Sequence, residues 1–500
     1  MEATPTPDDV YVARRRCPRS PARRARRGAQ TFAGLLTAAV FGGACAIGTP
    51  GVDAPSDQLH FPVAIERVGD RLLVLNTNFD RRYTGGSVAA LSIPALMAAA
   101  AAGLPDGAAP VIVRDPPGAF VALTQVPSFG SNLAARVRPD GGADVFALSR
   151  GDNVVTWLEL QGDTLGCNPD GVAPWPGTAC APGRIADTGF LDPASLLFLD
   201  DVGPEGSLLV AHARATPDAV TSLVRAETRL GLLDLATFRA GFASSSTQSF
   251  ARAISDAPRR GGYLTLVRTA TPGVILAGSG EGSLTEPALV GDAALTPLRL
   301  SFAAGALAVA AEAPVAVGSL SSAVSTRGLV VDPSGRRAFA TLRMRQATTR
   351  TGVSGEPRIY NSVVATVDLR TRAVLGFVEL GQELGALYYV PRAAPLRPLL
   401  YAPDHRTGEL MVLDVGGVLP ELVAIVGERR EGANTTTPAL VRVPTDLEWV
   451  EWDGKTYVFA TNFGNSTLAL FDVSDADPRK HRVVARFGRA IGDDGLTEAP

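Results

Sequence analysis

The chain has 500 residues, of which 46% are hydrophobic and 19% are charged, and its formal net charge is -3. This composition supplies a large apolar core and excludes a mainly disordered protein. The 52 glycines and 37 prolines indicate many turns and short strands, which excludes a helical bundle. No basic strip with interleaved aromatic residues follows the N-terminal region, so nucleic acid is not expected as a partner.

Residues 1–44 are predicted to be a signal peptide. They hold eight arginines, between Arg14 and Arg27, against three acidic residues, and end in the uncharged run Thr31–Ala44. This run is too short to span a hydrocarbon core of roughly 30 Å and suits the apolar core of a signal peptide. We therefore expect export by the general secretory route, with a twin-arginine route and an uncleaved N-terminal anchor as alternatives.

Small residues, Gly42, Gly43 and Ala44, stand directly before Cys45. This arrangement resembles the lipobox of bacterial lipoproteins, in which cleavage leaves the cysteine as an acylated N-terminus. The resemblance implies lipid modification of Cys45, a linker over residues 45–57, and a location in the cell envelope. The protein would be lipid-anchored to a bacterial membrane and would face the periplasm or the cell surface.

From residue 58 onward, pairs of short apolar runs recur along the chain. Residues 71–80 with 86–91, and residues 456–464 with 466–472, each show an apolar strand, the polar turn Thr-Asn-Phe and a second apolar strand. Four further pairs lie at 144–149 and 153–158, 207–212 and 230–234, 337–342 and 363–368, and 399–404 and 409–414. Flanking apolar runs raise the count to four strands per unit, which is the number in a propeller blade.

A strand, the turn Asp332-Pro-Ser-Gly335, a second strand, a polar turn and a strand ending in Asp368 resemble the YVTN-type repeat, and the chain is similar to lactonase-like propellers. The resemblance implies an all-β fold, a β-propeller of four-stranded blades over residues 58–490, followed by a C-terminal tail, 491–500. Seven blades are predicted, with six or eight as alternatives, and a pair of β-sandwiches is the rival fold. The expected units are 58–115, 128–188, 190–245, 248–315, 323–381, 384–430 and 440–489.

Two local features interrupt the repeat. The alanine-rich segment 93–103 predicts a short helix between the third and fourth strands of the first blade, because Pro94 suits the first turn and Gly103 the end. Cys167 and Cys180 bracket a loop rich in proline and glycine. In an exported protein these two cysteines are expected to form a disulfide, worth roughly 3 kcal/mol in the chain-entropy model.

Motifs for chemistry are absent from the sequence. It contains no Gly-x-Ser-x-Gly nucleophile motif, and its four histidines lie far apart without metal-ligand spacing. We therefore expect no cofactor and no metal site, and assign no catalytic residue.

Polar turns between second and third strands should lie on the face that also carries the links between blades. We expect this face to bind a partner, through arginines that pair with carboxylate or hydroxyl groups. The candidate residues are Asn78, Asp80, Arg81, Arg82, Arg343, Arg345, Asp404, His405, Arg406, Asn462 and Asn465.

Two functions remain open on the sequence. The favoured one is a non-catalytic binding or scaffold module for a protein, peptide or glycan of the cell envelope. The alternative is a periplasmic, lactonase-like hydrolase with its site at the central channel. Two or more carboxylates gathered with a histidine or a metal in the channel would favour the enzyme.

Replacing Cys45 with Ala tests the predicted lipid anchor. The Cys45→Ala protein should appear in the soluble fraction of cells, because the acyl chains that hold it on the membrane are then missing. Fractionation with mass measurement checks this. A Cys45→Ala protein that stays membrane-bound at the mass of the unsubstituted protein would contradict the lipid anchor.

Overall fold

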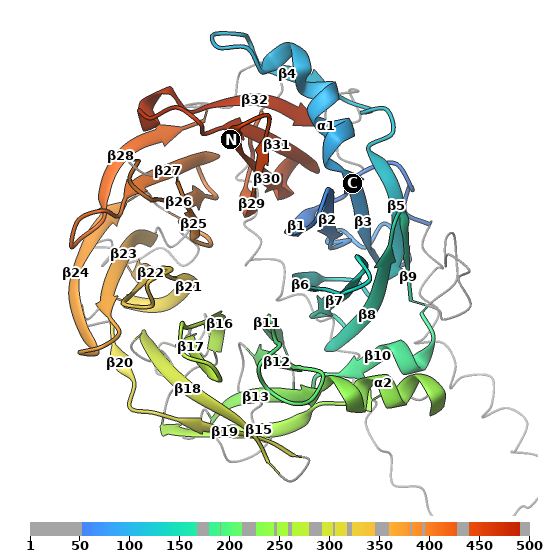
Figure 1. The fold of residues 1–500 in the computed structure, drawn as a ribbon, viewed down its shortest axis with the longest axis vertical. Coiled ribbons are helices and arrows are strands. Elements are labelled where there is room, and N and C mark those ends of the chain that lie inside the picture. Colours follow the sequence, from blue (N-terminus) through green and yellow to red (C-terminus); the bar gives the residue numbers. More distant parts are fainter. Residues whose placement is uncertain are drawn as a thin grey trace, which may run out of the picture. The chain divides into compact units, whose positions relative to one another are not determined.

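The computed structural model describes residues 53–167, 180–190, 192–212, 227–244, 248–258, 263–279, 293–303, 306–317, 323–345, 360–380, 383–392, 396–427 and 440–490. Its strands form seven sheets that stand side by side around a common centre, with one strand of each sheet innermost (Figure 1). The expected signal peptide, Cys45 and the C-terminal tail lie outside the described residues. No helix within these ranges is long and apolar enough to span a membrane.

Blades 1 to 4 come from the N-terminal two thirds of the propeller. Blade 1 holds β1 (Pro62–Val68), β2 (Arg71–Asn76), β3 (Gly86–Ser92) and β5 (Phe120–Val126). Blade 2 holds β6 (Gly130–Val137), β7 (Ala143–Ser149), β8 (Val154–Gln161) and β10 (Ile185–Asp187), with β9 (Thr164–Gly166) and β14 (Gln248–Ser249) added. Blade 3 holds β11 (Pro193–Leu199), β12 (Ser207–His212), β13 (Glu227–Asp234) and β15 (Ala251–Pro258). Blade 4 holds β16 (Tyr263–Arg268), β17 (Val274–Ser279), β18 (Ala294–Ala303) and β19 (Ala306–Ala311), with β20 (Val315–Ala316) added.

Blades 5 to 7 complete the ring. Blade 5 holds β21 (Ala323–Val331), β22 (Arg337–Arg345), β23 (Tyr360–Asp368) and β24 (Ala373–Leu380). Blade 6 holds β25 (Tyr388–Val390), β26 (Leu399–Asp404), β27 (Glu409–Asp414) and β28 (Glu421–Val426). Blade 7 holds β29 (Pro444–Trp452), β30 (Lys455–Asn462), β31 (Thr467–Asp472) and β32 (Arg482–Phe487), with β4 (Val111–Val113) added.

The predicted seven-bladed, all-β propeller is confirmed, and the recurring apolar pairs are the second and third strands of six blades. Three predicted blade limits are wrong, one of them because blade 4 begins with β16 at Tyr263 rather than at residue 248. Blade 1 ends with β5 at Val126 rather than at residue 115, and blade 3 ends with β15 at Pro258 rather than at residue 245. In both blades a helix follows the third strand and delays the fourth: α1 (Ile93–Ala100) in blade 1 and α2 (Leu235–Ser244) in blade 3.

The helix α1 confirms the prediction for residues 93–103. Ser92 precedes it and its hydroxyl accepts a hydrogen bond from the Ala95 amide, while Pro94 lies in the first turn. The short helix η2 (Ala101–Gly103) continues it to the expected glycine. Leu96 and Met97 are buried between blades 7 and 1. The described residues also contain the short helices η3 (Pro182–Arg184), η5 (Phe463–Asn465) and η6 (Pro478–Lys480).

Cys167 and Cys180 form a disulfide, with their Cα atoms 5.4 Å apart. Cys167 follows β9, and both cysteines are buried against the apolar core between blades 1 and 2. The pair therefore closes an insertion of blade 2, as the sequence predicts.

The ring closes between blades 7 and 1. Each of these blades forms its four main strands from its own segment of the chain. In addition, β4, from the insertion that follows α1 in blade 1, pairs in parallel with β32 at the outer edge of blade 7. Arg482 fixes this segment, because its guanidinium donates to the carbonyls of Gly103, Leu104, Pro105 and Ala108 at 2.7–3.1 Å. We call the pairing of β4 with β32, together with the hydrogen bonds of Arg482, the clasp. The clasp holds the first and last blades together.

Replacing Arg482 with Ala should destabilise the protein by about 2–3 kcal/mol, because four backbone carbonyls lose a charged donor at a partly exposed site. Urea unfolding of the purified protein measures this. The control is Arg479→Ala in η6, whose exposed side chain should change stability by less than about 0.5 kcal/mol. Equal stabilities of the two variants would show that the clasp contributes nothing to closure.

Candidate functional site

The loop face is defined here as the side of the propeller that carries the connections between second and third strands and the links between blades. Backbone hydrogen bonds join these two kinds of segment. The carbonyl of Phe61, just before β1, accepts from the Thr77 amide at 3.1 Å, and the carbonyl of Phe129, just before β6, accepts from the Arg150 amide at 2.8 Å. In blade 7 the carbonyl of Val443 accepts from the Phe463 amide at 3.1 Å. The described loops of blades 1, 2 and 7 are therefore held in place on this face.

Five of the predicted binding residues are buried: Asn78, Arg343, Asp404, Asn462 and Asn465. Asn78 donates to the Tyr83 carbonyl and the Ser128 hydroxyl, Asp404 accepts from the amides of Arg406 and Thr407, and Asn462 donates to the Leu440 carbonyl. Arg343 pairs with Glu383 at 2.8 Å, and Asn465 accepts from the Thr467 hydroxyl. These side chains fix the loops and contact other parts of the protein.

Four of the predicted residues are exposed: Asp80, Arg81, Arg82 and Arg406. Asp80 pairs with Arg82 at 3.4 Å, and the guanidinium of Arg81 lies 5.0 Å from the ring centre of Phe129. His405 is half-buried, and the side chain of Arg345 lies outside the described residues.

A cluster of phenylalanines on the loop face was missed by the sequence analysis. Phe61, Phe79, Phe129 and Phe463 come from blades 1, 2 and 7, and neighbouring ring centres lie 5.3–6.4 Å apart. Each ring is half-buried, so part of it meets solvent. The signal was the repeated Thr-Asn-Phe turn, which places Phe79 and Phe463 at equivalent points of neighbouring blades. These four residues form the phenylalanine cluster, an apolar feature of the loop face against which the guanidinium of Arg81 lies.

Three carboxyl groups lie on the innermost strands of neighbouring blades. Glu66 is on β1, and Asp446 and Glu448 are on β29. Asp446 Oδ2 accepts from the Ile65 amide at 2.9 Å, which ties blade 7 to blade 1. Each carboxyl keeps some contact with solvent and is otherwise surrounded by protein. We call Glu66, Asp446 and Glu448 the acid triplet.

The acid triplet holds its protons to unusually high pH. Burial, together with repulsion from Glu448 and Asp446, raises the pKa of Glu66 to about 8. Burial raises the pKa of Asp446 to about 7, even though two backbone amides donate to it. Burial and repulsion from Asp446 raise the pKa of Glu448 to about 7. The negative charges repel one another, so the three carboxyls do not all ionise together. Near neutral pH the triplet is therefore partly protonated.

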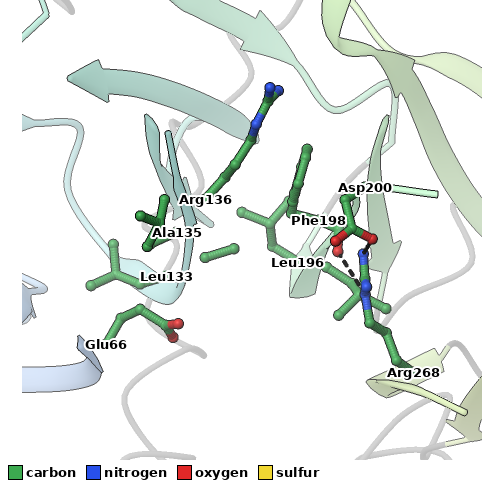
Figure 2. Close-up of a pocket in the computed structure, with 11 residues that line it drawn as sticks. Glu66, Leu133, Ala135, Arg136, Leu196, Phe198, Asp200 and Arg268 are labelled. Atoms are coloured by element: carbon green, nitrogen blue, oxygen red, sulfur yellow. Dashed lines mark hydrogen bonds and ion pairs between the residues drawn. The ribbon is translucent and has the colours of Figure 1, made fainter. Parts of the chain in front are cut away.

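A cavity of about 440 Å³ lies beside Glu66, along the inner strands β6, β11 and β16 (Figure 2). Leu133, Ala135, Leu196 and Phe198 form its apolar wall. Arg136 lies on one side, and Arg268, paired with Asp200 at 2.7 Å, lies on the other (Figure 2). Arg136, Asp200 and Arg268 stand at or just after the ends of their strands, so the cavity lies toward the face opposite the loop face.

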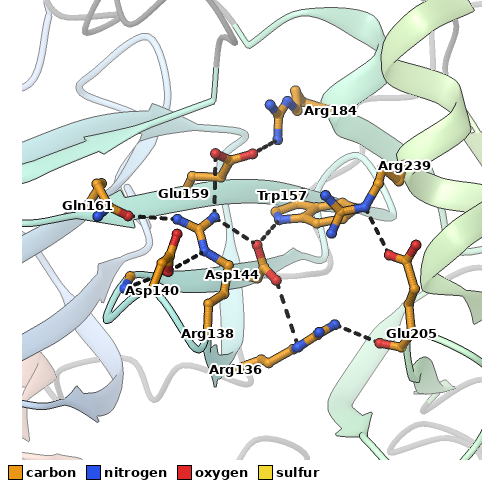
Figure 3. A network of polar contacts seen from close by, with 11 residues as sticks. Arg136, Arg138, Asp140, Asp144, Trp157, Glu159, Gln161, Arg184, Glu205 and Arg239 are labelled. Atoms are coloured by element: carbon orange, nitrogen blue, oxygen red, sulfur yellow. Dashed lines mark hydrogen bonds and ion pairs between the residues drawn. The ribbon is translucent and has the colours of Figure 1, made fainter.

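A polar network in blades 2 and 3 fixes Arg136 at the cavity (Figure 3). Its guanidinium donates to the Glu205 carbonyl at 2.6 Å and lies 4.0 Å from the buried Asp144. Asp144 also accepts from the Trp157 indole at 3.2 Å and from Arg138 at 3.3 Å. Because the network holds Arg136 in place, the cavity offers a preformed charged group beside an apolar wall.

The sequence analysis also missed the acid triplet and the arginines of the cavity. The available signal was a charged residue inside an apolar strand, as at Glu66 in Pro62–Val68 and Glu448 in Pro444–Trp452. His60 lies against the ring of Tyr83, and His481 contacts the Tyr401 hydroxyl. Within the described residues, no three His, Cys, Asp or Glu side chains gather in a way that would hold a metal ion.

The sequence matches no protein-family model and no curated protein. Among solved structures, hydrazine synthase of Kuenenia stuttgartiensis is similar at 11% identity and a TM-score of 0.51, over 86% of this chain and 99% of that one. A lactonase-like protein of Bacteroides fragilis, described as a 6-phosphogluconolactonase, has 11% identity and a TM-score of 0.42, over 78% and 87% of the two chains. The likeness to hydrazine synthase, at such low identity, shows the fold alone.

The acid triplet predicts that stability falls as pH rises toward 8. A glutamate with a pKa of 4.5 when unfolded and about 8 when folded binds its proton more tightly in the folded state. Its contribution is therefore complete below 4.5 and is lost as pH rises through about 8. Urea unfolding below and above this window measures the fall.

Glu66→Gln keeps the shape of the protonated side chain and should make the fall in stability with rising pH smaller. The control is Glu451→Gln, which removes an exposed carboxyl from the same strand as Glu448 and should leave the fall unchanged. A pH dependence that is the same in Glu66→Gln and in the original protein would show that Glu66 ionises normally.

Proposed function

We propose that this chain is an exported, lipid-anchored β-propeller that acts as a non-catalytic binding module for a protein, peptide or glycan of the cell envelope. The signal-like residues 1–44 and Cys45 support the location. The cavity beside the inner strands supports binding, and it is the observation that carries the proposal. An apolar wall between fixed charged groups suits a ligand with an apolar face and polar groups at its edges.

The fixed side chains of the cavity favour ligand binding over catalysis. Arg136 and Arg268 are each engaged by protein partners, and the wall between them consists of Leu133, Leu196 and Phe198. A ligand that enters this space gains contact with the aromatic ring of Phe198 and hydrogen bonds at its ends. Protein, peptide and glycan segments all combine these two kinds of group.

The acid triplet favours a second function, a lactonase-like hydrolase in the channel. A carboxyl whose pKa lies near 7 can donate a proton at neutral pH, and an ionised neighbour can accept one. Hydrolysis of a lactone needs both steps, one at the attacking water and one at the leaving oxygen. The triplet therefore meets one part of the criterion for an enzyme, which is the gathering of carboxyl groups on neighbouring inner strands.

Filling the cavity tests the binding function. Ala135→Trp places an indole against the cavity wall. The immobilised Ala135→Trp protein should therefore fail to retain most of the envelope components that the unsubstituted mature protein retains. The control is Val418→Trp, at a position that is 70% exposed on the link between β27 and β28. Mass spectrometry of the retained components gives the comparison, and a melting curve shows that both variants fold. Unchanged capture by Ala135→Trp would refute the cavity as the binding site.

A lactone assay with the purified protein separates the two functions. Under the binding proposal, the original protein releases no acid from a sugar lactone above the uncatalysed rate. Acid release that disappears in Glu66→Gln and Glu448→Gln, and persists in Glu451→Gln, would establish the hydrolase instead.

A further inference from the structure

The described chain enters the propeller on the loop face, next to the phenylalanine cluster. Asp53, the first described residue, lies against the loop that joins β2 to β3, where the Thr84 hydroxyl donates to Asp53 at 3.4 Å. The same loop carries Phe79, Arg81 and Arg82. Whatever is attached upstream of Asp53 is therefore tethered at this face.

The tether to the proposed lipid anchor is short. Cys45 and Asp53 are eight positions apart in the sequence, so the chain between them spans at most about 28 Å when fully extended. An acyl group on Cys45 enters the bilayer, and the cysteine itself remains at the headgroup level. The loop face is thus kept within one short tether of the lipid headgroups, whereas the opposite face is kept farther away by the depth of the propeller.

The surface at this point has the chemistry of a membrane contact. Phe61, Phe79, Phe129 and Phe463 each expose part of an aromatic ring. Phe61 and Phe129 have φ angles of 52° and 59°, which bulky residues seldom adopt, and so the backbone holds these rings on the surface at a conformational cost. Aromatic side chains that combine apolar area with a fixed position insert favourably at the boundary between headgroups and acyl chains.

Cationic side chains lie in the loops that carry the phenylalanine cluster, and the guanidinium of Arg81 contacts the ring of Phe129. Arg81, Arg82 and Arg442 are exposed, and Arg442 adjoins Val443, whose carbonyl holds the Phe463 amide. Asp80 offsets part of this charge through its contact with Arg82. Guanidinium groups donate two hydrogen bonds to a phosphate, the group that phospholipid headgroups present.

We propose that the loop face docks on the phospholipid surface of the membrane, with the phenylalanine cluster at the headgroup boundary and Arg81, Arg82 and Arg442 on lipid phosphates. This inference rests on the proposed lipid anchor at Cys45. It assigns the loop face to the membrane, and it turns the cavity between β6, β11 and β16 away from the bilayer, where envelope components reach it.

Fluorescence quenching by brominated phospholipids tests the docked orientation. Phe79→Trp and Phe463→Trp put a reporter into the phenylalanine cluster, and Val137→Trp puts one at the end of β6 on the opposite face, where Val137 is 63% exposed. Each mature protein is purified from the membrane fraction and reconstituted into vesicles with or without brominated lipid. The signal of the four native tryptophans is subtracted with the unsubstituted protein.

The expected result is that bromine quenches the Phe79→Trp and Phe463→Trp reporters several-fold more than the Val137→Trp reporter. Equal quenching at the three positions, or stronger quenching at Val137→Trp, would overturn the docking proposal and leave the anchor standing. A protein that is absent from the membrane fraction, with an unmodified Cys45, would overturn the anchor and the docking proposal together. A change in Phe79→Trp emission with soluble peptidoglycan fragments, without bromine quenching, would assign the loop face to a glycan instead.

Discussion

The structure depends on the burial of both faces of every blade. Successive residues of a middle strand alternate between two different cores: in β2, Leu72 and Val74 pack between blades 7 and 1, while Leu73 and Leu75 pack between blades 1 and 2. The same alternation occurs in β26, where Leu399 and Tyr401 face blade 7 and Leu400 and Ala402 face blade 5. Seven apolar clusters result among the described residues, one between each pair of neighbours. A blade in isolation would expose two apolar faces, so the ring is stable only when it is closed.

Two-sided burial also decides where polar chemistry can occur. The middle strands have no free face, so a charged group such as Asp144 lies near the end of its strand, where arginines and Trp157 contact it. Glu66, Asp446 and Glu448 lie on inner strands, where one edge meets solvent, and burial by the neighbouring blades raises their pKa values. The strand ends carry the polar residues that fix the loops, such as Asn78 and Asp404. The fold thus supplies two distinct surfaces, an inner one rich in carboxyl groups and a loop face rich in aromatic and guanidinium groups.

The sequence predicts the architecture better than the sites. Continuous apolar runs such as Leu72–Leu75 identify the second and third strands, because burial on both faces leaves no alternation to obscure them. Outer strands are harder to place, since one edge is exposed and helices such as α2 can separate them from their blade. The site residues depend on contacts between distant segments: Ile65 and Asp446 meet across the closure of the ring, and no local pattern shows this contact. The polar turns of blades 1, 6 and 7 were located correctly, whereas Arg343 and Arg345 lie within β22 rather than in a turn. The burial of Asn78, Asp404 and Asn462 depends on contacts between loops that only the structure reveals.

The clasp at Arg482 has a consequence for the order of folding. Arg482 and the Ala108 carbonyl are 374 positions apart, so this contact can form only after nearly all seven blades have left the ribosome. Contacts of such long sequence separation form slowly, because the entropy of closing the loop is lost before any contact is gained. Until then the facing apolar surfaces of blades 1 and 7 remain exposed to solvent, and the ring is not closed. Under the proposed export, such a chain crosses the membrane unfolded and completes its ring on the far side.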